Sequence, residues 1–129
     1  MKKTLAGIAA AAILGTTLTI GAAAPAEASV PWEYKNALAS AQSYVAIMDF
    51  SKKGLYHQLT SSYGEDFPAR AANYALQHVK VNYNHEALGA AKSYRKNMHM
   101  SANAIYDQLI SPYGEQFTVS QAKWAIKHL

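Results

Sequence analysis

Residues 55–67 read LYHQLTSSYGEDF, and the same pattern returns as IYDQLISPYGEQF at residues 105–117. When the chain is shifted by 50 positions against itself, residues 37–79 match residues 87–129 without a gap, at 18 of 43 positions. Chance would give only a few identities over this length. We therefore infer that the chain contains two copies of one structural unit, and this repeat guides every other interpretation.

Each copy reads as three helices. Apolar residues recur three or four positions apart from about residue 32 to 48, and again from about residue 84 to 98, which predicts the first helix of each copy. In the first copy this face is expected to carry Leu38, Ala41, Tyr44 or Val45, and Met48. No window alternates convincingly as a strand, so the predicted class is all-α.

The second helix of each copy lies between turn-forming residues. Ser51 and Ser101 are expected to cap its N-terminus, because a serine hydroxyl can accept hydrogen bonds from the free N–H groups of the next turn. Its buried face carries apolar residues four positions apart, Leu55 with Leu59 and Ile105 with Leu109. We expect this helix to end at Gly64 or Gly114, since glycine readily adopts the left-handed conformation that closes many helices.

The third helix of each copy begins after a phenylalanine in the turn, Phe67 in the first copy and Phe117 in the second. Thr118 and Gln121 have the spacing of a capping box, and Pro68 stands at the matching helix start of the first copy. The predicted buried stripe contains Ala72, Ala75, Leu76 and Val79, matched by Ala122, Ala125, Ile126 and Leu129. His78 and His128 stand near the ends of these helices, where a structural role is expected because a cation there suits the helix dipole.

The region between the copies leaves two arrangements open. Units of about 40 residues rarely fold alone without a metal or a disulfide. The two copies are therefore expected either to dock on each other or to share a long helix through residues 80–85. Asn82 and Asn84 make a helix break there about as reasonable as continuity.

The N-terminal segment reads as a secretory signal peptide. A basic start at residues 1–3 precedes an apolar stretch from Leu5 to Ile20, and Ala26-Glu27-Ala28 supplies the small residues that a signal peptidase requires. Cleavage is expected between Ala28 and Ser29, so residues 1–28 form the signal, residues 29–80 the first repeat and residues 81–129 the second. An uncleaved membrane anchor is the alternative, although the stretch is rich in Ala, Gly and Thr rather than Leu and Ile.

Composition excludes several classes of function. The chain has 129 residues, a formal net charge of +4 and no cysteine, which excludes disulfides, thiolate metal sites and a cysteine nucleophile. Neither an HExxH nor a GxSxG motif occurs, so we expect no enzymatic activity, no metal and no cofactor. A helix-turn-helix fold invites a DNA-binding interpretation, but the third helices carry few cations: Arg70, Lys123 and Lys127. We therefore expect no nucleic-acid partner.

Positions that differ between the copies give the candidate contact residues. At the end of the first helix, Val45-Ala46-Ile47 of the first copy becomes Arg95-Lys96-Asn97 of the second, with Lys92 one turn earlier. Residues 44, 45, 47 and 48 span most of a helical turn and cannot all face one small core. We predict that Val45 and Ile47 form an apolar contact surface for the other repeat or a partner, with Lys92, Arg95 and Lys96 as a basic counterpart. The alternative is that Val45 and Ile47 only enlarge the local core.

Several phrases together resemble the Ltp family of host cell surface-exposed lipoproteins, over roughly residues 30–129. They are VPWEYK at 30–35, MDFS at 48–51, LYHQLTSSYGE at 55–65 and IYDQL at 105–109. The resemblance implies tandem helix-turn-helix-like repeats and a location outside the membrane. It also implies superinfection exclusion, in which the protein stops an incoming phage from injecting DNA by engaging a phage protein of the injection apparatus.

The sequence departs from this family at the expected lipid anchor. The stretch after the apolar segment is Ala26-Glu27-Ala28-Ser29 where the family name implies a lipobox cysteine, so we expect no lipid anchor. The protein is then expected to be secreted, either released or held at the cell surface by non-covalent contacts. The alternative function is a secreted binding protein of the cell wall or envelope without a phage role, since mild basicity suits an anionic polymer.

Overall fold

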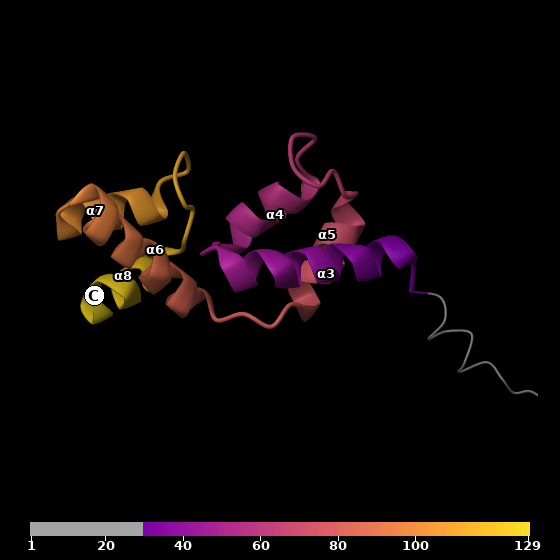
Figure 1. Ribbon diagram of the computed structural model, residues 1–129, viewed down its shortest axis with the longest axis horizontal. Helices are drawn as coiled ribbons and strands as arrows, with labels where there is room; N and C mark the ends of the chain where they lie inside the picture. The colour runs from indigo at the N-terminus through magenta and orange to yellow at the C-terminus, as the bar shows by residue number, and fades with distance from the viewer. Residues whose placement is uncertain (1–29) are drawn as a thin grey trace, which may run out of the picture. The chain divides into compact units, whose positions relative to one another are not determined.

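The computed structural model describes residues 30–129, which form six α-helices and no strand (Figure 1). In chain order they are α3 (Trp32–Ile47), α4 (Lys52–Thr60), α5 (Ala69–His78), α6 (Tyr83–Met98), α7 (Ala102–Ile110) and α8 (Val119–His128). The predicted all-α class is confirmed. The cleavage site expected between Ala28 and Ser29 lies outside the described residues. None of the helices in residues 30–129 is long and apolar enough to cross a membrane.

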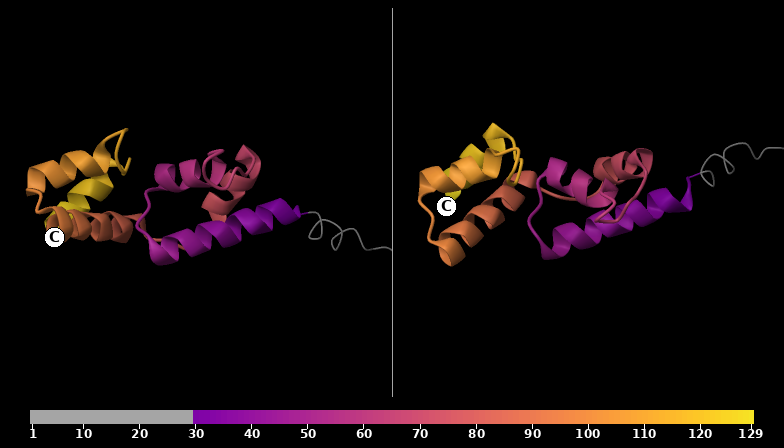
Figure 2. Two further views of the ribbon diagram at one scale, coloured as in Figure 1. Left: turned by 45° about the horizontal axis from the view of Figure 1, so that its top comes forward. Right: turned by 90° about the horizontal axis from the view of Figure 1, so that it is seen from above.

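The helices form two repeats of the same design. In the first repeat α3 packs mainly against α5, and in the second α6 packs mainly against α8, while α4 and α7 complete each three-helix unit (Figure 2). The tandem organisation predicted from the 50-residue shift is therefore confirmed.

Alanine dominates the core of both repeats. The first core contains Leu55 and Leu59 with Ala37, Ala41, Ala71, Ala72 and Ala75, and the second contains Ile105, Leu109 and Phe117 with Ala87, Ala90, Ala91, Ala122 and Ala125. Because alanine side chains are short, α3 and α5 can approach closely around the two leucines of α4, and the same holds in the second repeat. The fully buried aliphatic residues are Leu55 and Leu59 of α4 and Ile105 and Leu109 of α7, and such a side chain contributes roughly 1.5–3 kcal/mol of burial free energy.

The predicted helix starts are confirmed by their capping bonds. The Ser51 hydroxyl accepts from the Gly54 N–H at 2.9 Å, and the Ser101 hydroxyl accepts from the Ala104 N–H at 3.2 Å. Thr118 forms the expected capping box at the start of α8, with reciprocal bonds to its partner glutamine. Each bond satisfies one of the free N–H groups of the first turn, so these polar residues define where the helices begin.

The predicted helix ends at Gly64 and Gly114 are wrong. α4 ends at Thr60 and α7 at Ile110, because the chain folds back and uses the last carbonyls of the helix: the Glu65 N–H donates to the Gln58 oxygen at 3.0 Å. Neither glycine adopts a left-handed φ; that conformation belongs to Asp66 and Gln116, at φ 56° and 62°. Glycine is required for space instead, since a Cβ at Gly64 would lie 2.3 Å from the Gln58 oxygen.

The buried face predicted for the first helix extends one residue too far. Leu38, Tyr44 and Val45 do pack against the core of the first repeat, but Met48 is 55% exposed. α3 ends at Ile47, so Met48 lies where the chain already turns towards α4. Met98, at the last position of α6, is likewise 62% exposed.

The connection between the repeats is a break, and the repeats dock. α5 ends at His78, and the Asn82 side chain caps the new helix α6 by accepting from two of its N–H groups. The Phe50 N–H donates to Glu86 Oε1 at 2.8 Å, and the Ser51 hydroxyl donates to the Glu115 carbonyl oxygen. These contacts join the first repeat to the second, and we call residues 49–51 with Glu86 and Glu115 the junction.

The equivalent histidines have a structural role, as expected. His78 Nδ1 lies 2.8 Å from the Tyr74 carbonyl oxygen, and its ring stacks on that tyrosine with centroids 4.1 Å apart. His128 repeats the arrangement with Trp124, at 2.7 Å and 3.9 Å. Each ring is thus fixed against the last turn of its helix. Residues 30–129 contain no group of three or more acidic or histidine side chains that could hold a metal ion.

Candidate functional site: a groove at the junction

The two apolar candidates at the end of α3 have different surroundings. Val45 is half-buried and packs against the core of the first repeat, whereas Ile47 is 75% exposed. Val45 and Ile47 are two residues apart, which places them about 200° apart around the helix axis. They therefore cannot face the same side of α3. Val45 therefore has the local core role that was the alternative interpretation, and Ile47 remains as the candidate contact residue.

The three basic candidates on α6 also have different surroundings. Lys92 and Lys96 are exposed, and so is Arg95. However, Arg95 Nη1 donates a 2.7 Å hydrogen bond to the carbonyl oxygen of Leu129, at the end of α8. Arg95 thus fixes the end of the third helix to the first within its repeat. The three residues do not join Ile47 in one pocket.

A groove lies beside Ile47, where the end of α3 meets the second repeat. Its volume is about 390 Å³, and it is lined by Ile47, Met48, Asp49, Ala90, Ser93, Tyr94 and Glu115. Ile47 and Met48 supply exposed apolar surface, α6 supplies the wall, and two carboxylates supply charge. Exposed large apolar side chains next to a concave, partly charged surface are typical of protein contact sites.

A hydrogen bond fixes the floor of this groove. The Tyr94 hydroxyl donates to Glu115 Oε2, and burial together with this bond raises the pKa of Tyr94 to about 12. The matching pair of the first repeat, Tyr44 with Glu65, makes the same bond. Because the pair recurs in both copies, the bond is part of the repeat design, and the groove uses one copy of it.

The carboxylates of the groove lie close to one another and to the junction. Burial and the neighbouring charge of Glu115 both raise the pKa of Asp49. Burial also raises the pKa of Glu86, and the charge of Asp49 adds to this effect, while the Phe50 N–H acts in the opposite direction. The Asp49 carboxylate lies directly over Gly89 of α6, since a Cβ at that glycine would be 2.2 Å from Asp49 Oδ1.

Sequence reasoning missed most of this groove, although the signal was present. Asp49, Glu86 and Gly89 stand where the other copy has His99, Asn36 and Ala39. These divergent positions all lie where the two repeats meet, and only the structure shows that they are close together. A comparison of the two copies marks these positions as divergent, but it does not show that they lie together beside the groove.

The comparisons with known proteins agree with the two-repeat fold. A family model described as host cell surface-exposed lipoprotein, Lipoprotein_Ltp, matches residues 32–79 and again residues 82–129. Among solved structures, the chain is similar to Ltp, a superinfection exclusion protein from the Streptococcus thermophilus temperate phage TP-J34. The two are 36% identical with a TM-score of 0.71, over 78% of this chain and 99% of that one. No significant match was found among curated proteins. The family description agrees with the surface or extracellular location expected from the N-terminal segment.

Proposed function

Because the chain belongs to the Ltp family of host cell surface-exposed lipoproteins, we propose that it acts outside the membrane as a superinfection exclusion protein. It binds a protein of the incoming phage and so blocks the injection of DNA. It works by contact and carries out no catalysis.

The single observation that carries this proposal is the likeness to the phage protein, which spans both repeats and nearly all of that protein's chain. A shared fold alone says little about function, because one fold can host many activities. Here the match covers both repeats and carries 36% sequence identity, which is more than a likeness of fold alone. The proposal therefore rests on the whole tandem, and both repeats take part.

The groove at the junction is the site that we assign to partner binding. Ile47 and Met48 are the anchors, because their exposed apolar side chains flank a groove with two carboxylates. Burial of one such side chain in a partner contributes roughly 1.5–3 kcal/mol. The Tyr94 ring, held by its bond to Glu115, supplies a rigid wall against which a partner can pack.

Retention at the cell surface must be achieved without a lipid on cysteine, since the chain contains none. The exported protein then depends on affinity for its target or for the envelope. A freely diffusing inhibitor needs tighter binding than an anchored one, because anchoring raises the effective concentration at the membrane. We therefore expect protection from phage to increase with the level of expression.

The test is expression of the full chain in a phage-sensitive host. Adsorption of phage should be unchanged, while injection of DNA and plaque formation should fall. Changing Ile47 and Met48 together to aspartate should restore plaque formation. The matched control changes Asn97 and Met98, the equivalent exposed positions of the second repeat, and should leave protection intact. Normal DNA injection by every phage tested would contradict the proposal.

The second candidate function is envelope binding without a phage role. The charge of residues 29–129, ten Lys and Arg against seven Asp and Glu, favours it, because a basic protein is attracted to anionic wall polymers. Sedimentation with purified cell walls distinguishes the two candidates. Salt-sensitive binding to walls, in a strain that phages infect normally, would favour this second function.

A further inference from the structure

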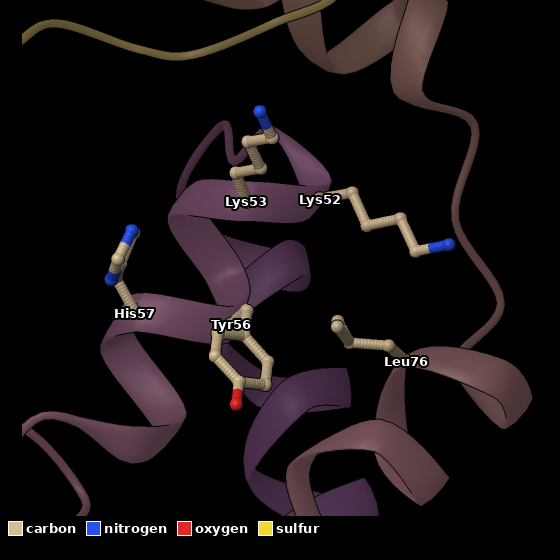
Figure 3. A pocket seen from close by; sticks show the side chains of 5 residues that line it. All are labelled: Lys52, Lys53, Tyr56, His57 and Leu76. Atoms are coloured by element: carbon tan, nitrogen blue, oxygen red, sulfur yellow. The ribbon is translucent and has the colours of Figure 1, made fainter. Parts of the chain in front are cut away.

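A second pocket lies on the first repeat, between α4 and α5, away from the lining of the junction groove. It has a volume of about 280 Å³ and is lined by Lys52, Lys53, Tyr56, His57 and Leu76. In Figure 3 the Leu76 side chain extends from α5 towards α4, where Lys52 and Tyr56 flank the opening, and Lys53 and His57 project from the other side of α4. We propose that this pocket binds an acidic protein segment that inserts one apolar side chain between Tyr56 and Leu76.

The apolar part of the pocket is a fixed feature of the repeat. Tyr56 and Leu76 are half-buried and pack against the core of the first repeat. Their equivalents, Tyr106 and Ile126, pack in the same way against the second core. The floor is therefore rigid before any ligand arrives, so little conformational entropy is lost on binding.

The basic part of the pocket is specific to the first repeat. Lys52, Lys53 and His57 are exposed lining residues, with Lys52 beside the opening and Lys53 and His57 on the far side of α4. The second repeat has Ala102, Asn103 and Asp107 at these positions. The lysines do not serve the stability of α4. They stand in its first turn, which contains no acidic residue, and a cation there opposes the helix dipole. Their placement is explained by attraction of an anionic ligand.

The size and chemistry of the pocket together select the class of ligand. Small-molecule sites usually measure about 300–1,000 Å³, so this pocket is at the lower limit for a whole ligand and suits one anchoring side chain of a larger partner. A wall polymer of sugar and phosphate would satisfy the lysines but leave the Tyr56 and Leu76 floor without an apolar partner. An acidic peptide with one large apolar residue satisfies both parts. This inference does not depend on the proposed role in superinfection exclusion.

The experiment uses a fluorescein-labelled peptide with two glutamates on each side of one phenylalanine, and the full chain. Fluorescence anisotropy should show saturable binding that weakens as salt is raised. Replacing the glutamates by glutamine, or the phenylalanine by serine, should weaken binding by about tenfold or more. Absence of saturable binding to the first peptide overturns the proposal.

The two repeats supply the matched variants. Lys52→Ala, Lys53→Asn and His57→Asp together convert the pocket to the second-repeat residues and should weaken binding at least about tenfold. The reverse set, Ala102→Lys, Asn103→Lys and Asp107→His, should create a second site and raise the stoichiometry from one peptide to two. Each substitution introduces the residue that the equivalent position of the other repeat already carries, so both variants are expected to fold. Thermal melts followed by circular dichroism verify this.

Two further probes separate other occupants. Polyphosphate and vesicles of phosphatidylglycerol are tested with the same variants. If either binds through Lys52 and Lys53 while the peptide does not, the occupant is an anionic polymer or a membrane surface, and the proposal is wrong. Peptide binding that is unchanged in the converted first repeat overturns it as well.

Discussion

The hydroxyl of Ser51 donates a hydrogen bond to the carbonyl oxygen of Glu115 and thereby joins the N-cap of α4 to the second repeat. Ser51 is 1% exposed, whereas Ser101, its equivalent in the second repeat, is exposed. Both hydroxyls cap their own helix, but only Ser51 also makes a contact between repeats. This serine thus caps its helix in both repeats, but it makes a hydrogen bond to the other repeat only in the first.

This difference predicts unequal effects of the same substitution. Ser101→Ala should cost about 1 kcal/mol, the usual value of an N-cap. Ser51→Ala should cost about 2 kcal/mol, because it also leaves the Glu115 carbonyl oxygen without its partner in a part-buried hydrogen bond. Urea denaturation of both variants measures the difference. Equal losses would mean that the bond to Glu115 contributes nothing to stability.

The close approach of Asp49 to Gly89 predicts energetic coupling between them. Gly89→Ala should stabilise α6 by about 1 kcal/mol through helix propensity, but the new Cβ displaces the Asp49 carboxylate and offsets this gain. In the Asp49→Ala background the full gain should appear. A double-mutant cycle measures the coupling, which we expect at about 0.5 kcal/mol or more.

The matched control for this cycle is Ala39→Gly in α3, which reports helix propensity at the equivalent exposed position. It should lose about 1 kcal/mol whether or not Asp49 is present. If the stability change from Gly89→Ala is the same in both backgrounds, Asp49 does not occupy the space above Gly89 in solution.

The raised carboxyl pKa values at the junction predict a specific dependence of stability on pH. Burial raises the pKa values of Asp49 and Glu86, so the folded state holds these protons more strongly than the unfolded state does. Protonation of these two carboxyls therefore stabilises the folded state as the pH falls from 7 towards about 4, where the carboxyls of the unfolded state also become protonated. Asp49→Asn should raise the free energy of unfolding at pH 7 and reduce this dependence.

The measurement compares urea midpoints of the wild type and Asp49→Asn at pH 7 and pH 5. The advantage of Asp49→Asn should shrink at the lower pH. Asp107→Asn, on the exposed face of α7, controls for the change in net charge. A constant difference between wild type and Asp49→Asn at both values would refute the assignment.

Much of the fold could be predicted from the sequence because its determinants are local or repeated. The apolar spacing of Leu55 with Leu59 and the caps at Ser51 and Thr118 depend on neighbours within one turn of helix, which the sequence places directly. The end of α4 was mispredicted because its last carbonyls bond to Glu65 and Phe67, beyond the turn. Gly64 is required because the backbone passes close to Gln58. From the sequence, a glycine needed for such a close approach cannot be distinguished from one needed for a left-handed φ.

The groove could not be predicted in the same way, because it depends on how two similar units meet. Ile47 was found because it differs from Asn97 in the second copy. Val45 was grouped with it, although the rotation of the helix turns Val45 into the core. Glu115 gave no signal, because Glu65 is identical to it in the first copy. Its separate role arises from the carbonyl bond to Ser51.

The Tyr94 hydroxyl predicts a distinct behaviour at alkaline pH. Its pKa of about 12 exceeds the ordinary value of 10, because burial and the bond to Glu115 disfavour the phenolate. The folded state therefore keeps this proton between pH 10 and 12 while the unfolded state loses it, and stability should fall as the pH rises through that window. In Tyr94→Phe this part of the loss should disappear, and the ultraviolet titration of the folded protein should lack its last tyrosinate step. If Tyr94→Phe instead loses one tyrosinate from the main step near pH 10 and keeps the last step, Tyr94 ionises with the exposed tyrosines, and its bond to Glu115 does not persist at high pH.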